Sequence, residues 1–569
     1  MVLAGPGSGK TKTLTVAIAR ALAEDIAEPR GIACITYNNE CAIELEGRLR
    51  QLAIEPNERV FIGTVHSFAL TQVIFPYARC VLPELGDEIR VATAEEQRAA
   101  IDRAHAQTIG GAEDPQARWK FAEAKRRRDV DRENADWHSV NPELAKFIEA
   151  YEGILHAKGL IDFDDMPLLA LRIVRSHPWV RQALKAKFPV LFVDEYQDLG
   201  HALHELVLLL CFEAGIRLFA VGDPDQSIYG FLGANPQLLT SLAARDDVRE
   251  IRLRFNYRSG TTIIAASLAA LGEERDYRAP KDTAAGVVNF HPVAGDLDAQ
   301  AEFVFRDLIP ALRADGTPFE QIGVLYRAAK HGDAAAIAAK AQDIPIVRAD
   351  TNALVKRSSR LSRFVEACAA WVTGGWKDAD PPFHRLAKDA TALVLGVGST
   401  SEERAIVEAQ LMNFLRAGMS DADIAAASTH AWLKAFRREV LTGWMERART
   451  ITEEWDAIDQ MIRRTDSEAF DDADLPLSHF GGRIEGIGRV NLSTLHSAKG
   501  REFDAVVILG ANNDVIPNYY EHKSEGRLRE ARRQFYVGVT RARRKLSLVY
   551  QSKAHSAFVA ELYKRVQAV

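Results

Sequence analysis

Near its N-terminus the chain reads Ala4-Gly5-Pro6-Gly7-Ser8-Gly9-Lys10-Thr11. A short apolar run precedes this stretch and a helical pattern follows it, which is the setting of a phosphate-binding loop. Glycines let backbone N–H groups approach phosphate oxygens, and the N-terminus of the next helix adds partial positive charge. The pattern predicts that Lys10 reaches the β- and γ-phosphates and that Thr11 holds Mg²⁺. The alternative is a flexible glycine-rich turn.

A second stretch delivers two acids at the end of a buried strand, Val190-Leu191-Phe192-Val193-Asp194-Glu195. Open α/β sheets bind ligands at the carboxyl ends of their strands. We therefore expect Asp194 to bind Mg²⁺ and Glu195 to polarise an attacking water. Two acids that merely cap a strand are the alternative, which is weaker beside the loop at Lys10. Together the two stretches predict hydrolysis of a nucleoside triphosphate.

The composition excludes several classes of protein. With 569 residues, 47% hydrophobic and 26% charged, the chain is too long for one small binding module and too apolar for wholesale disorder. Its 72 Lys and Arg against 78 Asp and Glu give a net charge of −6, so it is not a polycation that coats nucleic acid. Within 489–569, however, 15 Lys and Arg face 7 Asp and Glu, an excess of 8 positive charges that fits a local groove for a phosphate backbone. The run Lys125–Arg128 could add to such a groove, or be a solvated helix face.

Cysteine usage and hydropathy address the compartment. The five cysteines include no CxxC pair, which favours reduced thiols over a disulfide framework or a zinc site. The longest apolar run, near Val207–Phe212, is far shorter than the ~20 residues of a membrane span. We expect a soluble cytoplasmic protein with no membrane partner.

Short β-branched runs alternate with helical patterns, which predicts parallel α/β sheets. Two sets of predicted strands occur: Gly31–Tyr37, Arg59–Gly63, Pro189–Asp194, Arg217–Gly222 and Arg249–Leu253, then Val287–His291, Gln321–Tyr326, Arg489–Ser493, Ala505–Leu509 and Lys545–Tyr550. Charged helical sequence interrupts the first set, and Ala-rich helical sequence too long for a loop interrupts the second. The sequence thus predicts two α/β units, each with a mainly helical insertion.

The string Asp194-Glu195-Tyr196-Gln197-Asp198 resembles a motif of the UvrD/Rep-like superfamily 1 DNA helicases. Seven further strings match that family, and they occur in the expected order along most of the chain: the loop at Lys10; Thr36-Tyr37-Asn38-Asn39-Glu40-Cys41-Ala42; Gly63-Thr64-Val65-His66-Ser67; Val221-Gly222-Asp223-Pro224-Asp225-Gln226-Ser227-Ile228-Tyr229-Gly230-Phe231; Asn256-Tyr257-Arg258-Ser259; Thr494-Leu495-His496-Ser497-Ala498-Lys499-Gly500-Arg501-Glu502-Phe503; and Tyr536-Val537-Gly538-Val539-Thr540-Arg541-Ala542-Arg543. Each string is short, but their shared order is specific.

The resemblance implies two RecA-like P-loop NTPase domains. The first (1A) would span 1–75 and 163–280 and be truncated at its N-terminus, with a helical insertion (1B) at 76–162. The second (2A) would span 281–376 and 489–569, with a short 2B-like helical insertion at 377–488. ATP would lie in the cleft between the two domains, and opening and closing of this cleft would drive movement.

For ATP, the resemblance assigns Gln226 to sensing the γ-phosphate and water, and Arg258 and Arg541 to neutralising the transferred phosphoryl group. An arginine at that place is worth ~10³–10⁵ in rate, although either arginine alone reads as a surface ion pair. The expected catalytic set is Lys10, Asp194, Glu195, Gln226, Arg258 and Arg541. The expected ATP-binding set is Ala4, Gly5, Pro6, Gly7, Ser8, Gly9, Lys10, Thr11, Lys12, Tyr257 against adenine and Glu502 at the ribose, with Thr11 and Asp194 on Mg²⁺.

For DNA, the resemblance implies that Tyr37 and Phe231 are platforms for unstacked bases. Read alone, either ring would be assigned to the core. Stacking of ~1–3 kcal/mol per base tolerates any sequence, which suits a translocase. Thr64, His66, Thr494 and His496 would lie near the strand backbone. The implied partners are single-stranded DNA and tailed duplex DNA.

Several positions depart from the family pattern. Ala4 and Lys12 replace the usual Gly and Arg, Glu40 a Lys, Phe255 a Gln and Leu232 an Arg. The usual adenine-reading glutamine segment before the loop is absent, so we expect either an upstream start or weakened nucleotide binding. Loss of the Arg at 232 removes donors near the DNA, which makes coupling less certain than hydrolysis.

Three functions follow from these residues. The leading one is an ATP-dependent DNA helicase and single-stranded DNA translocase that moves 3′ to 5′ in repair, replication or recombination. The second is a DNA-binding or partner-recruiting protein with an impaired ATPase. The third is a translocase that strips proteins from DNA in a repair or defence complex. A nuclease is disfavoured, since no separate acidic metal cluster is evident.

Overall fold

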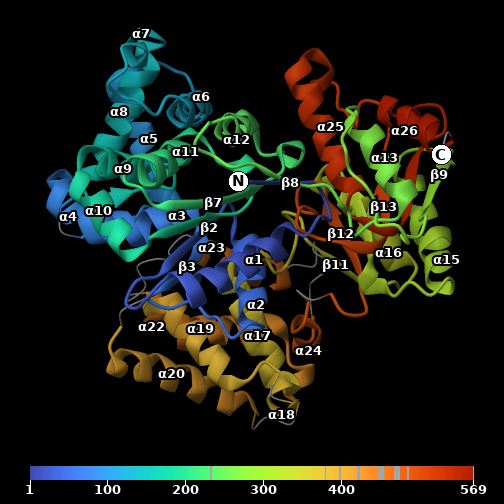
Figure 1. Cartoon of the computed structure of the whole chain (residues 1–569). Helices are drawn as coiled ribbons and strands as arrows, with labels where there is room; N and C mark the ends of the chain where they lie inside the picture. The colour runs from blue at the N-terminus through green and yellow to red at the C-terminus, as the bar shows by residue number, and fades with distance from the viewer. Residues whose placement is uncertain are drawn as a thin grey trace.

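Two six-stranded parallel sheets organise the molecule (Figure 1). The computed structural model describes residues 1–86, 88–230, 233–378, 380–395, 399–419, 423–445, 454–466, 475–483 and 486–567. The expected α/β class with parallel sheets and helical insertions is confirmed within these residues.

The first sheet has the order β3-β2-β6-β7-β1-β8. Its strands are β1 (Val2–Ala4), β2 (Ile32–Thr36), β3 (Val60–Thr64), β6 (Val190–Val193), β7 (Arg217–Gly222) and β8 (Ile251–Leu253). β6 is apolar throughout and β2 is apolar up to its last residue, Thr36, and both are buried on both faces, as is typical of strands inside a parallel sheet. β1 has only three residues, yet it lies inside the sheet and pairs with both β7 and β8.

Helices cover both faces of the first sheet and leave two hydrophobic clusters against it. These helices are α1 (Lys10–Arg20), α2 (Asn39–Arg50), α3 (Val65–Phe68), α4 (Phe75–Val81), α9 (Asp165–Ser176), α10 (Pro178–Lys187), α11 (His201–Leu208) and α12 (Pro236–Ala243). Because all strands run parallel, the loops after β1, β2, β3, β6 and β7 meet at one edge. That edge carries nearly every candidate residue of the first unit.

The second sheet has the order β11-β12-β10-β13-β14-β9. Its strands are β9 (Val287–Val293), β10 (Ile322–Tyr326), β11 (Ile346–Arg348), β12 (Val490–Thr494), β13 (Phe503–Leu509) and β14 (Ala542–Gln551). The helices against it are α14 (Leu297–Phe303), α15 (Ile309–Ala314), α16 (Ala329–Ala341), α25 (Glu525–Val539) and α26 (Ala557–Gln567). The edge strand β11 was not expected from the sequence.

Helix α13 (Thr261–Leu271) packs in the core of the second sheet, not the first. Ile263, Ala266 and Leu271 are buried in one cluster with Phe535 of α25 and Phe558 of α26. We therefore propose that the second unit begins at Gly260, the residue before this helix, and that the domain division at 280 lies too late in the chain.

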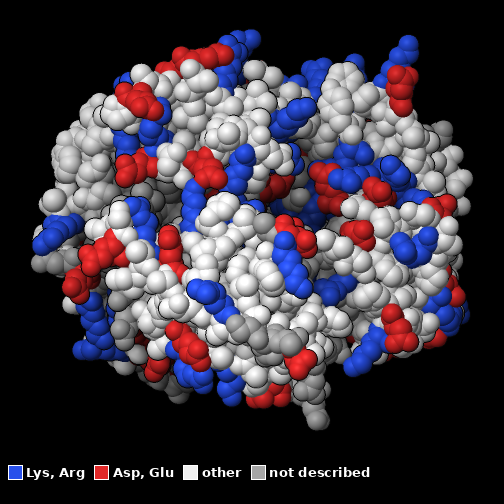
Figure 2. Space-filling view, turned by 90° about the horizontal axis from the view of Figure 1, so that it is seen from below, with Lys and Arg blue, Asp and Glu red and all other residues white. Residues whose placement is uncertain are grey.

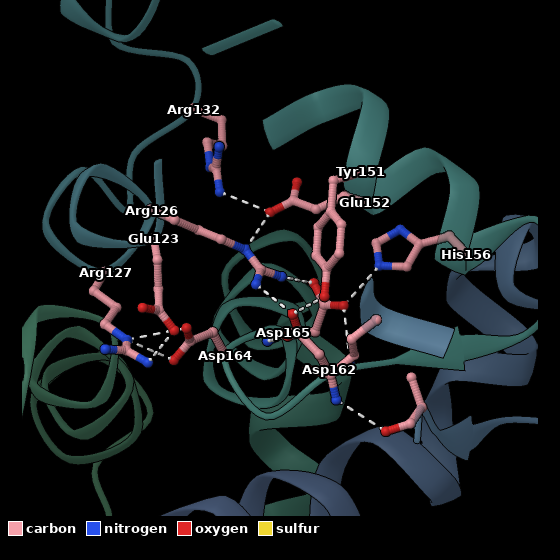
Figure 3. Close-up of polar contacts among 12 residues, drawn as sticks. Glu123, Arg126, Arg127, Arg132, Tyr151, Glu152, His156, Asp162, Asp164 and Asp165 are labelled. Carbon is pink, nitrogen blue, oxygen red and sulfur yellow. Dashed lines mark hydrogen bonds and ion pairs between the residues drawn. The ribbon is translucent and has the colours of Figure 1, made fainter. Parts of the chain in front are cut away.

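The first insertion is a helical cluster closed by a two-stranded parallel ribbon, β4 (Arg90–Val91) with β5 (Leu160–Ile161). Its helices are α5 (Ala94–Thr108), α6 (Pro115–Arg128), α7 (Asp136–Ser139) and α8 (Pro142–His156). A buried ion network joins it to α9 (Figure 3). Arg126, which has no exposed side-chain surface, bonds Glu152, Asp162 and Asp165 at 2.7, 2.7 and 2.5 Å.

The second insertion is another helical cluster with its own core, which runs from Leu354 to Phe480. Its helices are α17 (Arg360–Ala370), α18 (Trp376–Asp378), α19 (Phe383–Leu395), α20 (Ser401–Met419), α21 (Thr429–Phe436), α22 (Thr442–Met445), α23 (Trp455–Asp466) and α24 (Leu477–Phe480). It also touches α2 of the first unit, since Arg360 pairs with Glu46 at 2.7 Å. The core thus includes residues before 377, the expected start of this insertion.

Charged side chains of both signs are interspersed on the face that carries the second insertion (Figure 2). Among the described residues of this face, Lys and Arg form no continuous basic patch, as the net charge of −6 suggests. Among the described helices, none is long and apolar enough to cross a membrane.

Candidate nucleotide and DNA site

The glycine-rich loop joins β1 to α1, with Ala4 at the end of the strand and Lys10 at the start of the helix. Gly7 and Gly9 have φ of +67° and +86°, which side chains rarely adopt. A Cβ on Gly7 would lie 2.5 Å from Oδ1 of Asn256. The hydroxyl of Ser8 donates to the Gly5 carbonyl at 2.7 Å and closes the turn. Pro6 is buried, Thr11 half-buried and Lys12 exposed, so Lys12 lies outside this cradle.

Lys10 points at the acid pair after β6. Its Nζ lies 3.2 Å from Oε1 of Glu195, and Asp194 is buried beside them. Burial and the charge of Glu195 raise the pKa of Asp194 to about 7. Burial also opposes ionisation of Glu195, but the charges of Lys10 and Lys499 outweigh it and hold the pKa of that carboxyl at about 2. The pKa values of the two neighbouring carboxyls therefore differ because their surroundings differ.

The cradle and the acids fit ATP with Mg²⁺. The space beside Gly9 is open, because a Cβ there would meet nothing within 4 Å, and the N-terminus of α1 with Lys10 adjoins it. A hydroxyl on Thr11 and a carboxylate on Asp194 are the hard oxygen donors that Mg²⁺ prefers. These two residues would hold the ion.

Gln226, expected to sense the γ-phosphate, bridges the two units. Its Nε2 donates to Oδ2 of Asp223 at 2.5 Å, and its Oε1 accepts from Nη2 of Arg541 at 3.2 Å. Arg541 lies between α25 and β14 of the second unit and is 2% exposed. Burial, then the charge of Arg258, lowers its pKa to about 9.

Arg258 also crosses between the units. It donates to the carbonyl of Thr540 at 3.1 Å and to Oε1 of Glu502 at 2.8 Å. Glu502 in turn pairs with Arg543 at 3.0 Å. Both expected arginines thus lie at the junction of the two units, on the side of the glycine-rich loop.

Tyr257 remains available for a base. Its side chain is 70% exposed, and its backbone N–H donates to the Gly7 carbonyl at 2.9 Å. The exposed ring of Phe255 lies 6.2 Å away, centroid to centroid. The structure therefore places an exposed aromatic surface directly beside the glycine-rich loop.

Sequence reasoning gave no role to Lys499, although it lies within a quoted motif. Its Nζ, from the loop after β12, bonds Asp198 and the Gln226 carbonyl, the latter at 2.9 Å. It is also 3.9 Å from Oε2 of Glu195. The position of this lysine within the motif string, directly before Gly500, was the available signal.

Arg275 and Tyr277 were missed as well. Nε and Nη2 of Arg275 donate to the two carboxylate oxygens of Asp225 at 2.8 and 2.9 Å. The Tyr277 hydroxyl donates to the same carboxylate at 3.3 Å. The Tyr277 ring also packs against the loop, because a Cβ on Gly5 would lie 2.4 Å from it. No motif contains either residue, so only the fold could reveal them.

Three rings cross the junction on the side where DNA is expected. Tyr37 stacks on Tyr229 at 5.1 Å and 29°, and His496 lies 6.4 Å from Tyr229. The Nζ of Lys499 lies 5.2 Å from the centre of the Tyr229 ring. Tyr229 was not expected as a site residue, and it lies between Tyr37, an expected base platform, and Lys499. Phe231 and Leu232 lie outside the described residues.

The same turn occurs once in each unit. Thr64 ends β3 and its Oγ1 accepts from the N–H of Ser67 at 3.1 Å, while Thr494 ends β12 and accepts from Ser497 at 3.1 Å. Each turn carries a histidine, and burial lowers the pKa of both His66 and His496 to about 4. His66 stacks on Phe163 at 3.7 Å.

Comparison with known proteins agrees with this geometry. Residues 1–246 match the family model of the UvrD/REP helicase N-terminal domain, and residues 471–553 match that of the UvrD-like helicase C-terminal domain. DNA helicase II of Salmonella typhimurium and that of Escherichia coli are 27% and 26% identical, over 99% of this chain and 84% of theirs. ATP-dependent DNA helicase PcrA of Leuconostoc citreum is 25% identical, over 100% of this chain and 81% of its own. With both family models matched in order across the two sheets, the chain belongs to the UvrD/Rep-like superfamily 1 helicases.

Proposed function

We propose that this chain is an ATP-dependent DNA helicase and single-stranded DNA translocase that moves 3′ to 5′ and works in DNA repair, replication or recombination. One observation carries the proposal. Arg541 and Lys499 of the second unit bond Gln226 and Asp198 of the first, beside the phosphate-binding loop. Hydrolysis at this junction can therefore change the relative orientation of the two units.

The side chains divide the chemistry among them. Lys10 and the loop N–H groups bind the β- and γ-phosphates, and Mg²⁺, when held by Thr11 and Asp194, offsets phosphate charge. With its pKa at about 2, Glu195 orients and polarises water rather than storing a proton. Arg258 and Arg541 face the charge that builds on the phosphoryl group. Tyr257 covers the base, with Glu502 at the ribose.

The link to DNA runs through one short path. Lys499 touches Asp198 and Gln226 on the nucleotide side and lies over the Tyr229 ring on the other. Tyr229 stacks on Tyr37, an expected base platform. A shift of Lys499 during hydrolysis would therefore move the surface on which bases stack.

The test combines hydrolysis and strand separation by the whole chain. We expect ATP turnover to rise with single-stranded DNA and a duplex with a 3′ tail to be unwound, whereas one with a 5′ tail is not. Lys10→Ala removes the phosphate clamp and should abolish both, while Arg20→Ala, at the exposed end of the same helix, should change neither.

Other outcomes favour the other functions. DNA binding without stimulated turnover would indicate a recruiting protein with an impaired ATPase. Movement along single strands without unwinding would indicate a translocase that strips proteins. Full turnover in Lys10→Ala would contradict the assignment of the loop.

A further inference from the structure

The segment that follows α13 folds back onto the first sheet. Helix α13 lies in the core of the second sheet, yet residues 274–278, the fold-back segment, return to the chain just after β8. Phe255 forms a parallel bridge with Arg278, and the N–H of Asn256 donates to the Arg278 carbonyl at 2.8 Å. The chain thus reaches from the second unit to the nucleotide loop before it enters β9.

Two side chains of the fold-back segment meet at one buried carboxylate. The Asp225 side chain is 4% exposed. It accepts from Nε and Nη2 of Arg275, one nitrogen to each oxygen, and also from the hydroxyl of Tyr277. A two-pronged bond from a guanidinium fixes the direction of a carboxylate as well as its place, which a single bond does not.

Asp225 in turn holds Gln226. Both belong to the short 3₁₀ turn Pro224–Gln226. The N–H of Asp225 donates to Oδ1 of Asp223 at 3.1 Å, and Oδ2 of Asp223 accepts from Nε2 of Gln226 at 2.5 Å. The side chain expected to sense the γ-phosphate is therefore tied to the same small network as Arg275.

Tyr277 also contacts the glycine-rich loop. Its ring lies so close to Gly5 that a Cβ there would clash with it. The carbonyl of Gly5 accepts from the hydroxyl of Ser8, which closes the loop. One side chain thus touches the phosphate-binding loop with its ring and the turn of Gln226 with its hydroxyl.

The turn requires a cation because it carries two buried acids. Burial, then the charge of Asp225, raises the pKa of Asp223 to about 6. Phosphates bound at the loop would bring further negative charge to the same place. Arg275 supplies the positive charge to Asp225, and loss of the cation from a buried ion pair leaves an uncompensated charge that distorts or destabilises its surroundings.

We propose that Arg275 and Tyr277 are positioning residues, which hold Gln226 in place relative to the glycine-rich loop by way of Asp225. Neither residue lies in a motif string of the family. They act on the residue that senses the phosphate, not on the phosphate itself. The inference rests on the proposed function, because the expected loss is one of ATP turnover.

The test separates turnover from nucleotide affinity. Arg275→Gln removes the two-pronged bond, and Tyr277→Phe removes the hydroxyl but keeps the ring against Gly5. Arg278→Gln is the matched control, because this neighbour is 63% exposed and pairs with Asp276. Turnover at saturating ATP and binding of a non-hydrolysable ATP analogue are measured for each chain.

We expect Arg275→Gln to lower turnover by roughly 10- to 100-fold, because a misplacement of about 1 Å in a site can cost that much. Tyr277→Phe should lower it by a smaller factor. Affinity for the analogue should stay as in Arg278→Gln. Arg275→Lys, which keeps the charge but not the planar fork, should restore part of the turnover. Equal losses of affinity and turnover would overturn the proposal.

A double-mutant cycle identifies the residue through which Arg275 acts. In a Gln226→Ala background, Arg275→Gln should lower turnover little further, because the positioned side chain is already gone. The same fold loss in both backgrounds would overturn the proposal, and so would parent-like turnover in Arg275→Gln.

Hydrogen exchange tests the positioning without any hydrolysis. With Mg·ADP bound, residues 222–229 should exchange faster in Arg275→Gln than in Arg278→Gln, while strands β2 and β6 exchange alike in both. Unchanged exchange at the turn would overturn the proposal. A parent chain that fails to hydrolyse ATP would contradict the proposed function, and the exchange result would still decide whether Arg275 holds the turn.

Discussion

Nη2 of Arg541 donates to Oε1 of Gln226 across 3.2 Å, although 315 residues separate the two in the chain. Gln226 is anchored to the first unit by Asp223, and Arg541 is held in the second by the carbonyls of Val537 and Arg501. The contact therefore joins the two sheets at a point where a phosphoryl group would be recognised from both sides.

Arg541→Ala should lower ATP turnover by ~10³-fold or more while ATP affinity changes little, because the arginine acts on charge that appears only in the transition state. Single-turnover kinetics and equilibrium binding of a non-hydrolysable nucleotide measure the two effects. Arg544→Ala is the control, since that side chain is 77% exposed. Equal losses in affinity and turnover would contradict a transition-state role.

Lys499→Ala should uncouple hydrolysis from DNA. Loss of the lysine leaves Asp198 buried without its cation, and burial already raises the pKa of Asp198 to about 6. Breaking a buried ion pair costs ~3–5 kcal/mol, which here would oppose closure of the two units. A double-mutant cycle with Asp198→Asn, read as DNA-stimulated turnover, checks this. Strictly additive effects would mean that the two residues act separately.

Tyr37→Ala should weaken binding of oligo(dT) by roughly 5- to 150-fold, which is the loss of one stacked base. Turnover without DNA should stay near the parent value. Tyr229→Ala should act in the same direction, because the two rings stack at 5.1 Å. Tyr563→Ala on α26, whose ring packs on Phe290, serves as the control. Parent-like affinity in Tyr37→Ala would assign that ring to the core.

Arg126→Ala should destabilise the first insertion by ~3–5 kcal/mol, because Asp162 and Asp165 would stay buried without their cation. Faster hydrogen exchange in α6 and α8 would report the loss locally, which suits a chain of several units. Arg128→Ala, whose side chain is 62% exposed, should leave exchange unchanged. Similar exchange in both variants would show that the network of Figure 3 adds little stability.

The buried His66 should make the fold less stable in acid. Burial lowers its pKa from 6.5 to about 4, with Asp164 and Arg127 acting in opposite directions. A histidine with a lowered folded-state pKa is fully stabilising above pH 6.5, and that stability is lost as pH falls through the interval from 6.5 to about 4. His66→Gln should flatten this dependence in urea unfolding. Part of the pH dependence should remain in this variant, because the pKa values of His496 and His204 are lowered too. If the stability of the variant changed with pH as steeply as that of the parent, the assignment to His66 would be contradicted.

Much of the fold was predictable because strand and helix patterns are local. The runs at β2, β6 and β10 are apolar on both faces and are bounded by loops, so they signal buried parallel strands. β11 was missed because it is three residues long, follows Pro345 and is only half-buried. The membership of α13 in the second core could not be predicted, since its main packing partners, α25 and α26, lie far away in the chain and leave no local pattern.

Some residues of the candidate site could be predicted from local motifs, and others could not. Residues inside motif strings, such as Gln226 and Arg541, could be assigned before any coordinates. Arg275 and Tyr277 support the loop from a segment without a motif, so their role depends on how the chain folds back. Tyr229 was visible in a motif, but a tyrosine next to the buried Ile228 reads as core until its stacking partner is known.

The paired turns at Thr64–Ser67 and Thr494–Ser497 have a consequence for the direction of travel. If both turns contact a DNA strand, two like contacts, one on each unit, cannot by themselves favour either direction along it. The two units differ at the strand beside each turn. Tyr37 follows β2, the neighbour of β3, in the first unit, whereas Arg327 follows β10, the neighbour of β12, in the second. One unit thus carries a ring at this position and the other an arginine that is paired with Glu521 at 2.5 Å, so in the proposed translocase this mismatched pair of neighbours would set the polarity of a stepping cycle.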